Sequence, residues 1–343
     1  MLSTPQFPLL RLPLVALRHT LRMMGPSDVF LLTLFFKRLR LVAQSIFPRT
    51  KPSFYVDYCG DQKVGVLYAR FSPKLNVPIL KINFRTKKEE FLKKWKIDGE
   101  KFRCCFDFPA NSDIPLIIIS SQDNTKFWKI LQTHFSRVFP KTGAPHVAVT
   151  VDTMSKVPKS EKVDLIEVKE SKNRILKTSE VEKFMEIYNP ILIYVHPRME
   201  GELSDKSCLL TCENLLISYS RHFSRQNFLN FSGKYLLLQN TILTSEDLKI
   251  FLETWHKGAD RHLKVVYVFG NTNFEKEKIL EGFDVKPWDK TRRPAIYPSR
   301  ARFINPEYHY DCTNAMDIVR ESDGALASIR IDPSAFMFYV WIL

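Results

Sequence analysis

From Ile114 onward the sequence alternates between runs that suit buried strands and segments with helical periodicity. Ile114–Ser120 is an almost continuous apolar run, as expected of a parallel strand that is covered on both faces. In Phe127–Val138 the apolar residues recur at helical spacing instead. Units of one strand and one helix that repeat every roughly 20 to 45 residues are typical of solenoids, in which each unit buries its face on the next. This part therefore predicts an α/β solenoid similar to leucine-rich repeats.

The elements on either side of this stretch complete an α+β protein. Ser245–His256 is the best-marked helix, with Thr244 as its N-cap and Gly258 after its end. We expect further strands and helices from β-branched, aromatic and apolar spacing. The strands are Phe54–Tyr58, Val64–Phe71, Ile79–Phe84, Phe102–Phe108, His146–Val151, Ile191–Val195, a run from about Leu215, Tyr235–Gln239 and Leu263–Phe269; the helix is Ser179–Ile187; and Ala325–Ile331 with Phe336–Ile342 forms a terminal antiparallel hairpin.

The first fifty residues predict two or three short helices. Pro13 suits a first helical turn, Leu17 and Leu21 follow at helical spacing, and Gly25-Pro26 ends that helix before Ser27 starts the next. So few residues cannot bury all their large apolar side chains among themselves. We therefore expect a docking module, with two alternatives: an amphipathic mitochondrial transit peptide, or helices that pack on the body of the chain.

This segment resembles the F-box of a large nematode family. The resemblance implies that the segment binds the Skp adaptor, which links a receptor to a cullin-RING ubiquitin ligase. It also implies which residues face the adaptor, namely Leu12, Pro13, Leu17, Leu21 and Leu32. The matching residues are Phe7 to Pro13, Leu17, Leu21, Met24, Pro26, Leu34 and Lys37-Arg38.

The second half resembles the F-box-associated domain of the second type, which is found attached to nematode F-boxes. Together the two resemblances imply an F-box helical module at residues 6–48 and an α/β substrate-recognition domain at 53–343, with 210–343 as its F-box-associated part. The matching residues are Leu243-Thr244, Asp247-Leu248, Phe251-Leu252, Trp255, Gly258, Leu263-Lys264, Asp317-Ile318, Arg320, Asp323-Gly324, Ala327, Phe338 and Val340-Trp341.

The net charge of +14 raises the alternative of a nucleic-acid-binding protein. Up to Val56 the chain has eight Lys or Arg and one acid, so half of the excess lies in the first 56 residues. The basic clusters Lys81 to Arg103 and Lys286 to Arg302 lack the interleaved aromatic residues of a nucleic-acid module. A solvated basic face is the simpler interpretation.

Other features predict no catalytic, metal or cofactor site. The sequence has no glycine-rich phosphate loop, no His-Glu-x-x-His zinc helix and no Gly-x-Ser-x-Gly nucleophile elbow. Cys208 and Cys212 have metal-like spacing, but no second pair accompanies them. Asp317 to Gly324 is acidic, and we expect Gly324 to supply a turn and Arg320 to pair with a neighbouring carboxylate.

We therefore predict a non-catalytic receptor subunit of a Skp-cullin-F-box ubiquitin ligase. It would bind the adaptor through its N-terminal helices and an unknown target protein through its C-terminal domain. We expect an intracellular protein, cytoplasmic or nuclear, because the apolar runs are too short to cross a membrane and no secretory signal is visible. The alternatives are nucleic-acid binding and a scaffold whose degenerate F-box no longer engages a ligase. The target, its binding face and the oligomeric state stay open.

Overall fold

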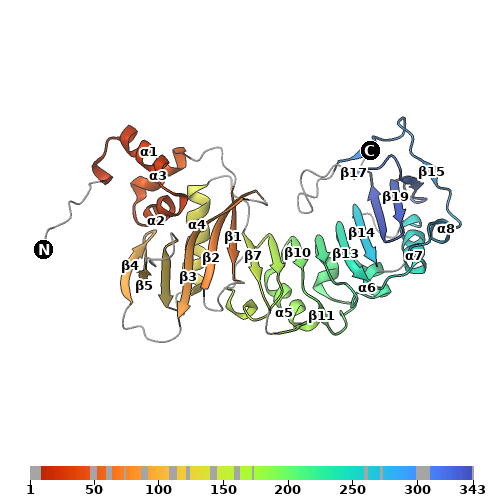
Figure 1. Cartoon of the computed structure of the whole chain (residues 1–343), viewed down its shortest axis with the longest axis horizontal. Coiled ribbons are helices and arrows are strands. Elements are labelled where there is room, and N and C mark those ends of the chain that lie inside the picture. Colours follow the sequence, from red (N-terminus) through yellow and green to blue (C-terminus); the bar gives the residue numbers. More distant parts are fainter. Residues whose placement is uncertain are drawn as a thin grey trace. The chain divides into compact units, whose positions relative to one another are not determined.

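The computed structural model has an α+β fold that divides into two compact units, Met1–Ile166 and Glu167–Leu343. Figure 1 shows the elements of both units along the chain. The structure describes residues 9–46, 52–58, 64–72, 75–85, 92–107, 114–120, 124–139, 145–157, 163–171, 174–258, 262–270, 273–298 and 310–341.

Unit 1 begins with a 3-10 helix, η1 (Leu9–Arg11), and three α-helices. They are α1 (Leu14–Met23), α2 (Pro26–Phe35) and α3 (Lys37–Ile46). The break between α2 and α3 lies at Phe36, whose backbone is extended. The apolar spacing alone fitted two helices as well as three. Leu17, Leu21 and Leu39 are buried and form the interior of this helical module.

A mixed sheet forms the body of unit 1. Its strand order is β7-β1-β2-β3-β6-β5-β4, with β1/β7 and β3/β6 parallel and the other pairs antiparallel. The helix α4 (Asn124–Val138) packs Phe127 against Phe102 and Phe135 against Phe54 of the sheet, and its Leu131 is also buried. The strands are β1 (Ser53–Asp57), β2 (Val64–Ser72), β3 (Leu75–Arg85), β4 (Lys93–Ile97), β5 (Glu100–Asp107), β6 (Leu116–Ser120) and β7 (His146–Val149); the 3-10 helix η4 is Met154–Lys156.

The helical module packs on this body. Ser27 Oγ donates a hydrogen bond to the Ile79 carbonyl of β3 at 2.7 Å, and the Phe30 ring lies 5.9 Å from that of Phe135 on α4. Leu34 of α2 accepts a backbone hydrogen bond from Asp98 in the β4–β5 turn, at 3.0 Å. The helices therefore pack on the sheet and on α4 of unit 1, and this packing leaves the docking interpretation a prediction. Figure 1 shows them, in red, beside the strands of unit 1.

Unit 2 is built on a row of parallel strands, in the order β10-β12-β13-β14. Antiparallel strands continue the row in the order β20-β19-β18-β15. The bounds are β8 (Leu165–Val168, which crosses the boundary), β9 (Leu176–Lys177), α5 (Thr178–Tyr188), β10 (Leu192–Val195), β11 (Met199–Glu200), η5 (Cys208–Thr211), β12 (Asn214–Ile217), α6 (Arg225–Asn230), β13 (Tyr235–Thr241), α7 (Ser245–His256), β14 (Val265–Gly270), α8 (Lys276–Leu280), β15 (Lys286–Pro287), β16 (Ile296–Tyr297), β17 (Tyr310–Asp311), β18 (Met316–Val319), β19 (Leu326–Asp332) and β20 (Ala335–Val340).

The parallel row has an internal period. Opposite residues on successive strands are Leu192, Asn214, Tyr235 and Val265, so the steps are 22, 21 and 30 residues. Side-chain hydrogen bonds link neighbouring repeats of this row at a spacing of 22 residues. Asn240 Nδ2 donates to the Ser218 carbonyl at 2.8 Å, Asn227 Nδ2 to Asp205 Oδ1 at 3.1 Å and Ser232 Oγ to the Leu210 carbonyl at 3.3 Å, each across 22 residues. These polar links satisfy backbone and side-chain groups that stacking buries.

Two predicted elements of unit 2, the helix α7 and the terminal hairpin, agree with the structure. The helix α7 has the bounds expected from the sequence, and Thr244 caps it in a reciprocal pair of hydrogen bonds with Asp247. The terminal hairpin is β19 and β20, joined by the expected Asp332 to Ser334 turn. Among the described residues, no helix is both long and apolar enough to span a membrane.

Candidate protein-binding sites

The helical module exposes apolar side chains on the side of α1 that faces away from its interior. Val15 is 68% exposed and Met23 is 88% exposed, while Leu14 on the same helix is 49% exposed. The exposed residues Arg18 and Arg22 lie among them. We call Val15, Arg18, Arg22 and Met23 the outer face of α1; Leu14 precedes Leu17 and Leu21 by three and seven residues and lies on their side of the helix. Exposed apolar residues grouped in this way are a feature of interaction sites.

The outer face differs from the set of contact residues implied by the F-box resemblance. Leu17 and Leu21 are completely buried, because they lie on the opposite side of α1 and pack inside the module. Pro13 is exposed, and Leu12 and Leu32 are partly exposed. The implied adaptor contacts thus stay a prediction, with Leu17 and Leu21 placed to support the module. The helical spacing alone could have identified Val15 and Met23, since both lie away from the Leu17 and Leu21 side.

A cluster of charged groups joins the module to the body. Asp98 lies in the β4–β5 turn with a left-handed backbone, φ 46°, and its carboxylate is 7% exposed. It forms ion pairs with Arg40 of α3 and with Arg137 of α4, the second at 2.6 Å. One carboxylate therefore links three elements that are far apart in the sequence. The contact to Arg40 adds to the backbone bond between Asp98 and Leu34, so the turn fastens two helices of the module.

His134 on α4 continues this cluster towards α2. Its Nε2 lies 2.9 Å from Thr33 Oγ1, which itself donates to the Phe30 carbonyl at 2.7 Å. The imidazole is therefore the donor to Thr33 and carries its proton on Nε2. Burial lowers the pKa of His134 to about 4, and the Arg40 and Arg137 charges oppose the raising effect of Asp98. The ring is neutral near pH 7 and acts as a fixed hydrogen-bond donor between body and module.

Unit 2 has an open hollow at the carboxyl ends of its parallel strands. The hollow has a volume of about 520 Å³, and its residues follow or end successive strands. Glu167 Oε1 lies 2.9 Å from His196 Nε2, and the Tyr194 ring lies 3.7 Å from the His196 ring. Polar side chains from several strands thus meet at one edge. The hollow is lined by Glu167, Lys169, Glu170, His196, Ser218, Tyr219, Gln239 and Asn240.

The hollow suits a polar segment of a protein. Tyr219 is 40% exposed and offers a ring, and Glu170 is an exposed carboxylate. Asn240 holds a left-handed backbone, φ 51°, which turns the chain at the end of β13. The sequence reading did not identify these residues. Their position directly after the predicted parallel strands could have identified them, because ligands bind beyond the carboxyl ends of strands in open α/β sheets.

The acidic block Asp317 to Gly324 is a set of ion pairs, as predicted for Arg320. Arg320 donates to both carboxylate oxygens of Asp323, at 2.8 and 2.9 Å, and Gly324 has φ +71° in the following turn. Asp317 is buried and accepts from Arg293 Nε at 2.8 Å and from Ser328 Oγ at 2.8 Å. The carboxylates of Asp317 and Asp323 are thus paired with arginines of the same unit and serve the packing of its C-terminal strands.

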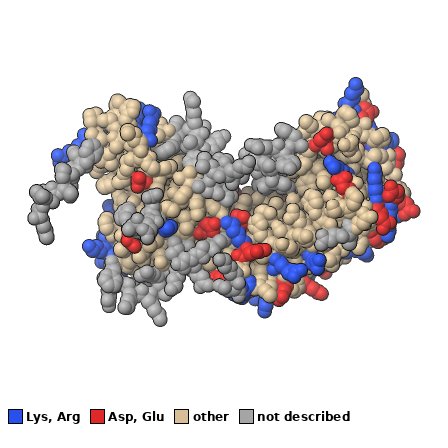
Figure 2. Space-filling view, in the orientation of Figure 1, with Lys and Arg blue, Asp and Glu red and all other residues tan. Residues whose placement is uncertain are grey.

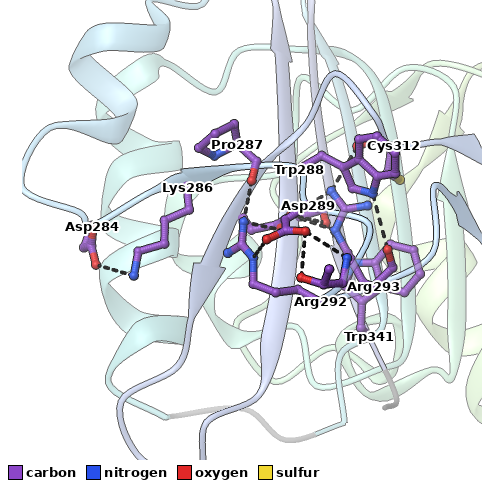
Figure 3. A network of polar contacts seen from close by, with 12 residues as sticks. Asp284, Lys286, Pro287, Trp288, Asp289, Arg292, Arg293, Cys312 and Trp341 are labelled. Carbon is purple, nitrogen blue, oxygen red and sulfur yellow. Dashed lines mark hydrogen bonds and ion pairs between the residues drawn. The ribbon is translucent and has the colours of Figure 1, made fainter.

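Arg293, the partner of Asp317, takes part in the network of polar contacts drawn in Figure 3. Its guanidinium lies 4.9 Å from the Trp341 ring and donates to the Cys312 carbonyl at 2.9 Å, while its own carbonyl accepts from Trp288. Both Arg293 and Asp317 have no exposed side-chain surface. The network ties the segment around Arg293 to strands β18 and β19 and to the end of the chain.

Cys208 and Cys212, the pair with metal-like spacing, are poorly placed to lose their protons. Burial raises the pKa of Cys212 to about 12, and burial also raises the pKa of Cys208. A thiol must lose its proton to bind zinc, so both shifts oppose it. No group of three or more His, Cys, Asp or Glu side chains in the described part of the chain is placed to hold a metal ion.

On the face drawn in Figure 2, basic and acidic side chains are interspersed.

Comparisons with known proteins give one relative. An uncharacterised protein of Caenorhabditis elegans is 30% identical to this chain over 95 residues. The match covers 27% of this chain and 26% of the relative, so the chain spans about a quarter of the length of that protein. No protein-family model matches the chain, and no solved structure matches it significantly.

Proposed function

We propose that the protein is the substrate-recognition subunit of a Skp-cullin-F-box ubiquitin ligase. One observation carries the proposal: a three-helix module is fastened to a sheet body through its inner side and exposes apolar and basic side chains on the outer face of α1. A helix with large exposed apolar residues suits burial against a partner. Such a complex works inside the cell, in the cytoplasm or the nucleus.

The adaptor would contact the outer face of α1 together with the adjoining η1 segment. Arg38 supports this segment, since its guanidinium donates to the carbonyls of Leu10 and Leu12, the second at 3.0 Å. The two residues Leu12 and Pro13 are thereby held next to Leu14 and Val15. A few large apolar residues at the centre of an interface usually provide most of its binding free energy. The exposed arginines favour an acidic rim on the adaptor.

Unit 2 would bind the target protein and hold it for the ligase. The 21- to 30-residue steps between parallel strands support a solenoid similar to leucine-rich repeats, and solenoids bind through extended surfaces. We place the target contact at the hollow lined by Glu170, His196 and Tyr219, because it collects polar groups and one exposed ring from successive strands. Ubiquitin transfer itself would be carried out by other subunits, so the receptor needs no catalytic residue.

The test is co-expression of the full chain with the Skp adaptor, followed by size-exclusion chromatography. Deleting the helices is unsuitable, because it would uncover Phe135 of α4, which is buried and packs against the Phe30 ring of α2. We therefore use Val15→Glu, which changes a 68% exposed residue, and Ile242→Glu as the control, which changes a 56% exposed residue of unit 2. We expect the first variant to bind the adaptor roughly tenfold or more weakly and the second to bind normally.

The outcomes separate the proposal from its alternatives. A complex that forms with the wild-type chain and survives Val15→Glu would show that the outer face of α1 is not the adaptor contact. Absence of any complex with the wild-type chain would refute the ligase role and leave a scaffold with a degenerate F-box. Circular dichroism and thermal melting of each variant exclude loss of folding as the cause.

A further inference from the structure

The sheet of unit 1 ends at the strand β4, which belongs neither to the adaptor contact nor to the hollow of unit 2. In the part of the chain that the structure describes, β4 pairs with β5 alone, in an antiparallel hairpin. Figure 1 shows it as the outermost strand, beside β5. Its residues Lys93 to Lys96 are all exposed. An exposed edge of this kind offers its unpaired backbone groups to another strand.

The hairpin register determines which backbone groups of β4 point away from β5. The turn after β4 has two residues, both with positive φ, 46° and 95°. Such a turn closes on a hydrogen-bonded pair, and hydrogen-bonded and non-hydrogen-bonded pairs alternate along the ladder. The N–H and C=O groups of Lys94 and Lys96 therefore point to the open side. The N–H of Asp98, two residues further on, points the same way and donates to the Leu34 carbonyl at 3.0 Å.

One face of this hairpin is basic. Two pairs of like charges lie side by side on it, Lys94 opposite Arg103 and Lys96 opposite Lys101. Like charges directly opposite each other destabilise a sheet. The segment 86–91, which precedes β4, contains two lysines and two glutamates and thus adds no net charge. A partner with negative charges would offset the repulsion between these pairs.

The other face of the edge carries an exposed indole. Trp95 is 40% exposed, and its ring lies 5.7 Å from that of Phe35 and 5.1 Å from that of Phe106. Phe36 is 39% exposed and lies 6.4 Å from Phe35. Lysines alone protect an edge strand from unwanted pairing, and this protection does not need an exposed tryptophan. Tryptophan is enriched at the centres of protein interfaces, so Trp95 favours a protein partner.

We propose that β4 binds an extended acidic segment of another protein, which adds a strand to the sheet of unit 1. The backbone of this segment pairs with the open groups of Lys94 and Lys96. Side chains alternate between the two faces of a sheet, so acidic residues of the segment meet these lysines and an apolar residue between them covers Trp95. Nucleic acid would match the charges but has no strand backbone to pair with the edge. The same lysines repel a second copy of β4, which makes the edge selective.

The test measures the binding of labelled peptides to the full chain by fluorescence anisotropy. The main probe is a short peptide that alternates glutamate with valine and phenylalanine. The comparison probes are a shuffled peptide of the same composition, a peptide with lysine in place of glutamate, and an oligothymidylate of equal charge. We expect the alternating peptide to bind roughly tenfold or more tightly than the shuffled one. Its binding should also slow amide hydrogen exchange in β4, measured by mass spectrometry.

Three variants locate the contact. Trp95→Ala should weaken binding roughly tenfold or more, as expected of a central interface residue. Lys94→Glu combined with Lys96→Glu should abolish binding of the glutamate peptide and allow the lysine peptide to bind. Lys276→Glu combined with Lys278→Glu is the matched control, because it makes the same change of charge at exposed positions of α8 in unit 2. The control should leave the affinity unchanged.

A proline separates the backbone contribution from the charge. Lys96→Pro removes the charge together with the outward N–H, whereas Lys96→Gln removes the charge alone. Proline is tolerated on an edge strand where the N–H would face solvent, and thermal melting of both variants checks that they fold. We expect the proline variant to bind roughly three- to tenfold more weakly than the glutamine variant, the effect of one hydrogen bond.

Binding of the shuffled peptide as tightly as the alternating one would overturn the proposal, since only unspecific charge attraction would remain. Oligothymidylate that binds more tightly and displaces the peptide would make this edge a nucleic-acid surface instead. Equal affinities of Lys96→Pro and Lys96→Gln, or unchanged exchange in β4, would refute strand addition. Absence of peptide binding at the highest soluble concentration would leave β4 a protective edge. The adaptor complex is measured separately, so failure of either proposal leaves the other standing.

Discussion

Replacing Asp317 by alanine tests whether the network around Arg293 holds the C-terminal strands together. The substitution leaves the Arg293 guanidinium without its carboxylate, at a position with no exposed side-chain surface. Breaking a buried ion pair by removing one partner typically costs about 3–5 kcal/mol. We expect the lower end of this range, because Arg293 keeps its bonds to the carbonyls of Cys312 at 2.9 Å and Pro294 at 3.1 Å.

The loss is measured by differential scanning calorimetry and by urea unfolding monitored by circular dichroism. For a unit of this length, 1 kcal/mol corresponds to roughly 2–4 °C, so the transition of unit 2 should fall by roughly 6–12 °C. Asp332→Ala is the control. Asp332 is 39% exposed and pairs with Arg330 at 3.0 Å, so its loss should cost less than about 1 kcal/mol.

A double variant, Asp317→Leu with Arg293→Met, removes both charges from the buried site. It should be more stable than Asp317→Ala, since no uncompensated charge remains. The reasoning fails if Asp317→Ala lowers stability by no more than the exposed control does. It also fails if the double variant is no more stable than the single one, because the cost would then lie in lost packing.

Three further predictions concern stability. Burial lowers the pKa of His134 to about 4 in the folded state, so its contribution to the free energy of unfolding is complete above pH 6.5 and is lost as the pH falls from 6.5 towards 4. Urea unfolding at pH 7 and pH 4.5 should show this loss of about 3 kcal/mol in the wild-type chain, and the loss should be absent in His134→Gln. Asp98→Ala removes the carboxylate shared by Arg40 and Arg137 and should lower the melting temperature of unit 1, while an unchanged temperature would show that the cluster does not fasten the module. Gly258→Ala should cost about 1–3 kcal/mol, since φ is +92° and a Cβ would meet Ser322 Oγ, and calorimetry of unit 2 checks it.

Local patterns predicted most of the regular structure. The helix α7 has the predicted ends, because its cap, acidic first turn and following glycine all lie within the segment itself. The strand β4 was missed: four of its five residues are exposed and three are lysines, so its sequence has the character of a charged edge strand rather than of a core. The helices α6 and α8 have six and five residues, too few to give a periodic pattern.

The sites were harder to predict, because distant residues form them. The Asp98 cluster joins residues 58 and 39 positions apart, and no spacing rule relates Asp98 to Arg40 or Arg137. The adaptor residues implied by the resemblance included Leu17 and Leu21, which lie on the buried side of α1, towards α3.

The helical module shares its interior with the sheet of unit 1, and this has a thermodynamic consequence. A partner that binds the outer face of α1 stabilises every element that unfolds together with that helix, in proportion to the logarithm of its concentration. The hydrogen bond from Ser27 to Ile79 and the ring contact of Phe30 with Phe135 make β3 and α4 such elements. Adaptor binding should therefore slow amide hydrogen exchange in β3 and α4, at positions that the adaptor never touches.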